Sequence, residues 1–324
     1  MQIMEFSNLR SQICQKTFTR HHLMTSDMDD SRKYRLKAYP LLSVSDAVPA
    51  TATQLEYPLI YERDQILGSC NGIVCVANRQ GGFAVFWNPS TRRFKKSPPL
   101  ENPRIPGSYA AYGFGYDHFA DSYNVVAVFW YEYKMRVKVH TLGTNCWRMI
   151  QDFPSFCVPQ SAVFVSGKLN WLALASESVA NLQRVRWVII SQDLGKECYQ
   201  ELLLPGDYED DGGKQATNLQ VLKDCLCVYI LSPRRRICDI WLMMEYGRKE
   251  SWTKLFTVPD PNICFSGTKI LHISKEDEGL VVKEHGILYL YNFRDNTFKI
   301  LPIRNIEDWT VPVVYVESLI SPCF

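Results

Sequence analysis

The sequence predicts an all-β protein built from repeated sheets. Of its 324 residues, 46% are hydrophobic and 13% aromatic, and Val, Ile, Tyr, Phe and Trp gather in short runs, which is the composition of half-buried strands. Turn dipeptides such as Asn71-Gly72 and Ser166-Gly167 separate these runs, as tight hairpins require. A strand-turn-strand unit recurs along the chain and predicts a repeat architecture.

Each copy of the unit ends in an aromatic residue, a polar stretch and a proline. The copies end at residues 88–99, 145–154, 198–205, 251–259 and 296–302. The apolar strands before them cover residues 72–76 and 83–87; 123–129 and 136–140; 161–165, 169–173 and 186–190; 219–222, 225–229 and 240–243; and 280–282 and 287–291. Four-stranded sheets repeated at about 40 to 50 residues are typical of propeller blades, which bury their faces against one another. We therefore expect a β-propeller.

The two ends of the chain differ from the repeats. The trailing strand 311–319 is expected to pair with early strands near residues 34–36 or 59–61 and so close the ring, which removes exposed edges. Residues 1–30 are instead expected to form a short helical piece, because their apolar residues are spaced about three to five apart. These residues are Phe6, Leu9, Ile13, Phe18 and Leu23. Residues 31–324 would form the propeller.

Composition limits the partners and the compartment. The net charge of +2 predicts no nucleic-acid binding, which needs a clearly basic face. The N-terminus lacks a signal-peptide pattern, and no apolar run approaches the roughly 20 residues that span a bilayer. Most of the eleven cysteines, such as Cys70 and Cys227, lie among apolar strand residues and are expected to be reduced. These features favour a cytoplasmic or nuclear protein that does not bind membranes.

Two motifs mimic catalytic or cofactor sites. Residues 68–72, Gly-Ser-Cys-Asn-Gly, have the spacing of a nucleophile elbow, but a strand follows where an elbow needs a helix, so a turn into a strand is expected. The Gly113-Phe114-Gly115 segment has no third glycine and no following helix, so we expect close strand packing with Asp117 capping a turn. The histidines are scattered along the sequence. Cys225 and Cys227 alternate in a predicted strand, so their thiols would point to opposite faces and could not bind the same metal ion. We therefore predict no catalytic, cofactor-binding or metal-binding residues.

Four motifs, in order along the chain, carry a family resemblance. They are residues 68–75 (GSCNGIVC), 87–92 (WNPSTR), 113–117 (GFGYD) with 121–126 (DSYNVV), and 167–172 (GKLNWL). Together they resemble the F-box-associated, kelch-like interaction domain of plant F-box proteins, from about residue 30 to the C-terminus. The resemblance implies a propeller that captures a target protein for ubiquitination, while an N-terminal F-box docks on the Skp-type adaptor of an SCF ligase.

The N-terminus departs from this pattern. Residues 5–26 resemble only the last part of an F-box and the link after it, so residues 1–30 are interpreted as a remnant. We expect the adaptor as a partner only if this incomplete F-box suffices. Without it, the chain would bind its target as a competitor of the ligase.

The function predicted is protein recognition without catalysis or a cofactor. The alternative is a propeller enzyme or a lectin-like, carbohydrate-binding propeller, because a closed propeller can carry either function. Long polar loops on a rigid scaffold often carry recognition, and two of them, residues 206–217 and 231–237, have opposite charge. The predicted target-contact residues in these loops are Arg234, Arg235, Arg236, Tyr208 and Asp210.

Overall fold

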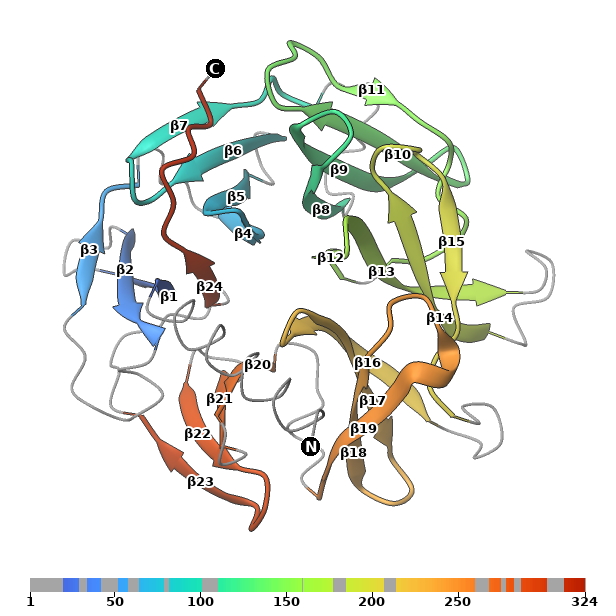
Figure 1. Cartoon of the computed structure of the whole chain (residues 1–324). Coiled ribbons are helices and arrows are strands. Elements are labelled where there is room, and N and C mark those ends of the chain that lie inside the picture. The colour runs from blue at the N-terminus through green and yellow to red at the C-terminus, as the bar shows by residue number, and fades with distance from the viewer. Residues whose placement is uncertain are drawn as a thin grey trace, which may run out of the picture.

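The chain forms a closed ring of six four-stranded antiparallel sheets (Figure 1), seen here in a computed structural model. The structure describes residues 20–28, 34–41, 52–57, 64–78, 82–100, 110–158, 160–176, 185–206, 214–259, 268–274, 278–282, 287–301 and 312–323. This architecture is a six-bladed β-propeller, which confirms the predicted fold class.

Each blade is a meander whose first strand lies near the ring centre and whose fourth strand lies at the rim. Blade 1 consists of β24 (Val313–Val316), β1 (His21–Met28), β2 (Tyr34–Pro40) and β3 (Thr53–Leu55). Blade 2 consists of β4 (Asp64–Cys70), β5 (Ile73–Asn78), β6 (Phe83–Asn88) and β7 (Arg93–Lys96). Blade 3 consists of β8 (Ala110–Asp117), β9 (Ser122–Tyr131), β10 (Lys134–Thr141) and β11 (Arg148–Met149).

The remaining blades repeat the same order of strands. Blade 4 consists of β12 (Val163–Val165), β13 (Lys168–Ser176), β14 (Val185–Asp193) and β15 (Tyr199–Leu202). Blade 5 consists of β16 (Gln215–Leu222), β17 (Cys225–Ser232), β18 (Ile237–Met243) and β19 (Trp252–Val258), with the 3-10 turn η1 (Lys249–Ser251) before β19. Blade 6 consists of β20 (Lys269–Ile273), β21 (Glu278–Val282), β22 (Leu288–Asn292) and β23 (Thr297–Ile300).

The C-terminal strand closes the ring, as predicted, but with a different partner. β24 pairs with β1, His21 opposite Val316 and Met24 opposite Val313, and not with residues 34–36, whereas residues 59–61 lie outside the described residues. The expectation of a helical segment up to residue 30 is therefore wrong for residues 21–28, which form β1. Residues 1–19 lie outside the described residues.

The burial of β1 explains why a strand forms there. Leu23 and Met24 are both fully buried, yet Leu23 packs with blade 6 residues such as Leu280 and Met24 with blade 2 residues such as Val74. Neighbouring residues of a strand point to opposite faces, so a strand can bury one side chain against each neighbouring blade. Packing within the ring outweighs the helical spacing of apolar residues.

One hydrophobic cluster fills each interface between neighbouring blades. Between blades 2 and 3, for example, the rings of Phe86 and Phe114 lie 6.0 Å apart and edge to face. Trp87 and Trp171 are the largest side chains with almost no exposure. Burial of each such side chain contributes about 1.5 to 3 kcal/mol, so the interfaces between blades are the core of the molecule.

In three of the five units, the repeated aromatic residue joins neighbouring blades at the rim. Trp147 Nε1 donates to the carbonyl oxygen of Pro98 at 2.9 Å, Tyr199 Oη to that of Gln151 at 3.1 Å, and Trp252 Nε1 to that of Leu203 at 2.9 Å. The bonded residues are separated by 49, 48 and 49 positions, which is the length of one repeat. In these three copies, the aromatic residue of the repeated unit is a hydrogen-bonded contact to the preceding blade, which we call a rim latch.

Most cysteines of the described residues are free thiols, as expected. Burial raises the pKa of Cys70 to about 12 and that of Cys75 well above its usual value. Cys238 in β18 differs from these thiols, because it is disulfide-bonded.

Connections between strands divide the ring into two faces. Because each strand reverses direction, the connections after the first and third strands of a blade lie on one face and the others lie opposite. On the first face, which we call the turn face, blades 2–5 have short connections at 71–72, 89–92, 118–121, 142–147, 166–167, 194–198, 223–224 and 244–251. The opposite face, the loop face, carries the described connections at 132–133 and 233–236, together with the described parts of longer connections, at 97–100, 150–158, 160–162 and 203–206.

Candidate interaction face

The motif at residues 87–92 fastens the C-terminal segment to the turn face. Asn88 is fully buried, and its Nδ2 donates to the carbonyl oxygens of Ser318 at 3.0 Å and Ile320 at 2.6 Å. Its Oδ1 accepts from the backbone N–H of Ser90 at 2.8 Å. One amide side chain therefore shapes the β6–β7 turn and holds the segment after β24, which we call the C-terminal clasp (residues 317–323).

Gly72, in the first motif, makes room for this clasp. Its φ of 81° is a left-handed conformation that favours glycine, and a Cβ atom there would lie 2.8 Å from Val316 O and overlap Ser318. Asn71, with φ 52°, completes a two-residue turn between β4 and β5. This confirms a turn into a strand where the sequence mimics a nucleophile elbow.

The third motif permits close packing between the inner strands of blades 3 and 4. A Cβ atom on Gly113 would lie 2.8 Å from Leu169 Cδ1, and one on Gly115 would overlap the Phe164 ring. Asp117 Oδ1 accepts from the backbone N–H of Phe119 at 2.9 Å, which caps the β8–β9 turn. Both expectations for this segment, close packing and a capped turn, are confirmed.

The fourth motif joins blade 4 to a turn of blade 5. Tyr246 Oη donates to Asn170 Oδ1 at 2.6 Å and lies 2.6 Å from Ser191 Oγ, while Trp171 Nε1 donates to Gln192 Oε1 at 3.2 Å. Burial raises the pKa of Tyr246, so this hydroxyl keeps its proton. The residues that carry the family resemblance thus hold the scaffold together.

A projecting hairpin on the loop face has a different character. β9 and β10 are joined by Glu132 and Tyr133, with φ of 50° and 64°. Two-residue turns with both φ values positive favour Asn-Gly, and a bulky residue there costs of the order of 1 kcal/mol. Such strain is maintained only where surrounding contacts enforce it, and it is concentrated at functional sites.

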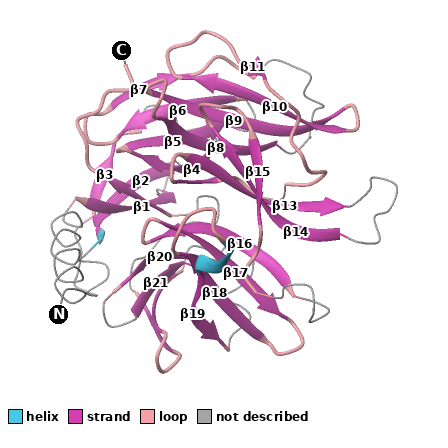
Figure 2. Cartoon of the chain, turned by 45° about the vertical axis from the view of Figure 1, so that its right-hand side comes forward, coloured by secondary structure: helices cyan, strands magenta, loops and turns pink. Residues whose placement is uncertain are grey.

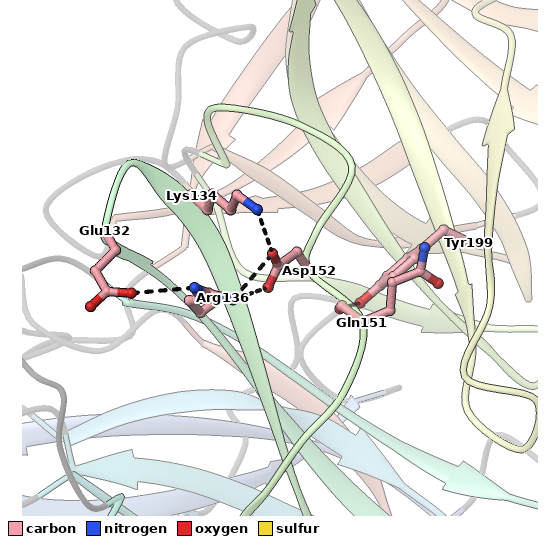
Figure 3. A network of polar contacts seen from close by, with 6 residues as sticks. All are labelled: Glu132, Lys134, Arg136, Gln151, Asp152 and Tyr199. Atoms are coloured by element: carbon pink, nitrogen blue, oxygen red, sulfur yellow. Dashed lines mark hydrogen bonds and ion pairs between the residues drawn. The ribbon is translucent and has the colours of Figure 1, made fainter.

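An ion-pair network ties this hairpin to a neighbouring segment of the chain (Figure 3). Arg136 Nη1 lies 3.1 Å from Asp152 Oδ1, and Arg136 Nη2 lies 3.4 Å from Glu132 Oε2. Lys134 Nζ lies 3.8 Å from the second oxygen of Asp152. The neighbouring Gln151 accepts the hydrogen bond from Tyr199, so blade 4 fixes the segment to which the hairpin is tied.

The fixed hairpin displays two aromatic side chains to solvent. Tyr133 is 92% exposed and Trp130 is 42% exposed. Exposed Tyr and Trp on a rigid support are the residue types that dominate binding energy in protein interfaces, because they lose little conformational entropy when a partner covers them. The hairpin reaches out on the right-hand side of Figure 2, while the C-terminal end lies on the left.

The predicted contact residues lie partly on the same face. Arg234, Arg235 and Arg236 are exposed at the tip of the β17–β18 hairpin, where Arg235 N donates to Ser232 O at 3.1 Å and closes the turn. The loop face therefore includes this basic tip on blade 5 and the aromatic hairpin on blade 3. Tyr208 and Asp210 lie outside the described residues.

Sequence reasoning missed Trp130 and Tyr133. The signal available was the run Phe129-Trp130-Tyr131-Glu132-Tyr133, which places aromatic residues at a strand end and gives the turn no glycine, asparagine or proline. An absent turn signal between two strong strands indicates a turn held by tertiary contacts.

Within the residues that the structure describes, no group of three or more His, Cys, Asp or Glu side chains has an arrangement that could hold a metal ion. The described part of the chain also contains no helix with the length and apolar character needed to cross a membrane.

Comparisons with known proteins agree with this architecture. The closed ring defines the class as a β-propeller domain, and a solved chain described as the "Crystal structure of Nidogen/Laminin Complex" superposes with a TM-score of 0.54, covering 92% of this chain and 99% of that one. With 9% sequence identity, this likeness shows the fold alone.

Sequence comparison identifies the family. The model of the F-box associated beta propeller domain matches residues 37–322, so the chain belongs to this family. The F-box/kelch-repeat protein At3g23880 of Arabidopsis thaliana is 29% identical over 302 residues, which cover 90% of this chain and 78% of that protein. F-box protein CPR1 of the same plant is 26% identical, covering 94% and 78% of the two chains.

Proposed function

We propose that this propeller recognises a target protein through its loop face, as the substrate-receiving part of an SCF-type ubiquitin ligase. The observation that carries the proposal is the strained β9–β10 hairpin, whose network holds Tyr133 and Trp130 exposed. A structure that maintains a costly turn in order to present two aromatic side chains has the properties expected of a recognition element.

The position of the chain ends supports the choice of face. β1 begins and β24 ends on the turn face, where Glu317 N donates to Arg20 O at 3.0 Å. A domain joined ahead of residue 20 would therefore connect at the turn face. The relatives named above are F-box proteins, and an F-box attached in this way would leave the loop face open to a target.

The test is affinity purification from plant cells with the chain carrying Trp130→Ala and Tyr133→Ala together. We expect the target proteins recovered with the natural chain to be lost, with the circular dichroism spectrum and the unfolding midpoint almost unchanged. Phe119→Ala is the matched control, because Phe119 is 85% exposed but lies in the β8–β9 turn on the turn face. Equal loss of targets with the control variant would contradict the assignment to the loop face.

The basic tip gives a second test of the same face. Charge reversal of Arg234, Arg235 and Arg236 to Glu should weaken target capture, because these side chains are exposed beside the same surface. Unchanged capture would exclude this tip from the contact while leaving the aromatic hairpin to be judged by its own variants.

Coupling to the ligase needs a separate measurement. We would compare the natural chain with a version joined to a complete F-box and probe both for the Skp-type adaptor and the cullin. Recovery of both subunits with the natural chain supports a working ligase receptor. Recovery only with the completed version would support target binding without ubiquitin transfer.

A further inference from the structure

The rim of blade 2 differs in charge from the rest of the rim. Its outer strand, β7, reads Arg93-Phe94-Lys95-Lys96, and none of its three cations forms an ion pair within the described part of the chain. The other outer strands contain at most one Lys or Arg each. Where such a cation has a carboxylate partner, as Arg148 has Glu197 and Lys254 has Asp239, the charge is compensated.

The outer edge of β7 pairs with no further strand within the described residues, and one of its outward carbonyl groups accepts a bond from the C-terminal clasp. Among the strands that the structure describes, β7 pairs only with β6, and Ser97 N donates to Ala84 O at 2.8 Å. Because hydrogen-bonded pairs alternate along an antiparallel ladder, Arg93 and Lys95 direct their backbone groups towards β6, and Phe94 and Lys96 direct theirs outward. The thiol of Cys323 in the C-terminal clasp donates to Phe94 O at 3.3 Å, which agrees with this orientation.

Cations lie on both sides of this edge. Lys95 is opposite Phe86, whose side chain faces blade 3, and Phe94 is opposite Trp87, whose side chain faces blade 1. Lys96 shares the side of Phe94, where its Nζ lies 3.5 Å from the centre of the Phe83 ring. A strand added to this edge would therefore meet positive charge on each face.

We propose that β7 binds an extended, acidic segment of a partner protein as an additional strand of blade 2. Main-chain hydrogen bonds to Phe94 and Lys96 would provide affinity, with the incoming strand displacing the Cys323 thiol from Phe94 O. The cations would select carboxylates, as in other cases of strand addition. A second copy of this chain is disfavoured, because two β7 strands would oppose like charges. This rim site is separate from the loop face and does not depend on the proposed function.

The basic side chains also explain why the edge stays unpaired without its partner. Lysines on an edge strand discourage pairing with neutral or basic strands, and acidic residues on the incoming segment convert this repulsion into attraction. One set of charges thus prevents unspecific pairing and selects the acidic strand.

The experiment measures binding of a short peptide in which glutamate alternates with valine, using fluorescence anisotropy at low salt and the full chain. A counterpart with glutamine in place of glutamate is the matched probe. We expect the glutamate peptide to bind, the glutamine peptide to bind about tenfold more weakly, and added salt to abolish the difference. Hydrogen exchange should show new protection of the Phe94 and Lys96 amides in the bound state.

Two variants with equal changes of charge separate this site from general electrostatics. Arg93→Glu with Lys95→Glu and Lys96→Glu should abolish binding of the glutamate peptide, whereas the triple reversal at Arg234, Arg235 and Arg236 should retain it. The proposal is overturned if both variants lose binding equally, if the bound state leaves the β7 amides unprotected, or if sedimentation shows that β7 instead joins two copies of the chain.

Discussion

The side chains of the turn face and those of the loop face have different partners. On the turn face, Asn88 and Gly72 are fitted to the C-terminal clasp, and the left-handed conformation at residue 72 suits a glycine. On the loop face, Tyr133 occupies a left-handed turn against its own preference and is 92% exposed. The difference teaches that the residues marking the family hold the ring closed, while the candidate recognition element lies between the motifs.

The largest expected effect on the turn face is that of Gly72→Ala. The added methyl group overlaps Ser318 and approaches Val316 O, and the left-handed backbone adds strain, so unfolding should need about 3 kcal/mol less free energy. Chemical denaturation would measure this loss.

Gly206→Ala is the control, because Gly206 has φ 67° but no neighbour within 4 Å of the new Cβ. It should cost only the backbone strain, about 1 kcal/mol. Equal losses in the two variants would mean that the clasp does not press on Gly72.

Asn88→Ala should lower the free energy of unfolding by about 2 kcal/mol, because it leaves buried carbonyl groups of the clasp without a donor. The corresponding residue of blade 6, Asn292, accepts from Arg294 N at 2.9 Å but forms no contact to the clasp that the described residues show. Asn292→Ala should therefore cost less than 1 kcal/mol, as a turn residue does. Thermal unfolding of both variants compares the two turns directly, and a larger effect at Asn292 would contradict the role of the clasp.

The rim latches extend the comparison to the outer strands. Trp252→Phe keeps one aromatic ring but removes the N–H that donates to Leu203 O and part of a buried side chain, which together should cost about 1 to 3 kcal/mol. Phe298, at the matching position of blade 6, has no donor and is 64% exposed, so Phe298→Leu should change stability by less than 0.5 kcal/mol. Urea denaturation of both variants compares their free energies of unfolding and so tests whether the latched aromatic residue contributes more to stability than the unlatched one.

The smallest expected effect has the opposite sign. Tyr133→Gly relieves the left-handed strain and should raise the free energy of unfolding by about 0.5 to 1 kcal/mol. The same variant should capture less target, because it removes the exposed ring. A variant that is more stable and still captures its target normally would show that the strained turn has no part in recognition.

Local patterns predicted the blades, and long-range contacts account for what was missed. Turns such as Asn71-Gly72 and the alternating strands are determined by neighbouring residues, so they could be read directly. The pairing of β24 with β1 joins residues from the two ends of the chain. Nothing in the local sequence of either segment indicates which strand it pairs with. The conformation of Glu132 and Tyr133 depends on Asp152 in a separate segment, so the candidate site was not predictable from local sequence. For Arg234, Arg235 and Arg236 the sequence located an exposed tip, and their contact with a target stays a prediction.

The closure of blade 1 by β24 has a consequence for synthesis on the ribosome. Blades 2 to 6 are each continuous in sequence and can form as the chain emerges, but β1 waits for residues 313–316 before its inner edge is paired. Until then the nascent ring carries an open seam with an exposed strand edge, the kind of surface that chaperones cover and that promotes aggregation. Termination anywhere before Val313 would leave this seam open, so completion of the last strand acts as a checkpoint for the whole propeller.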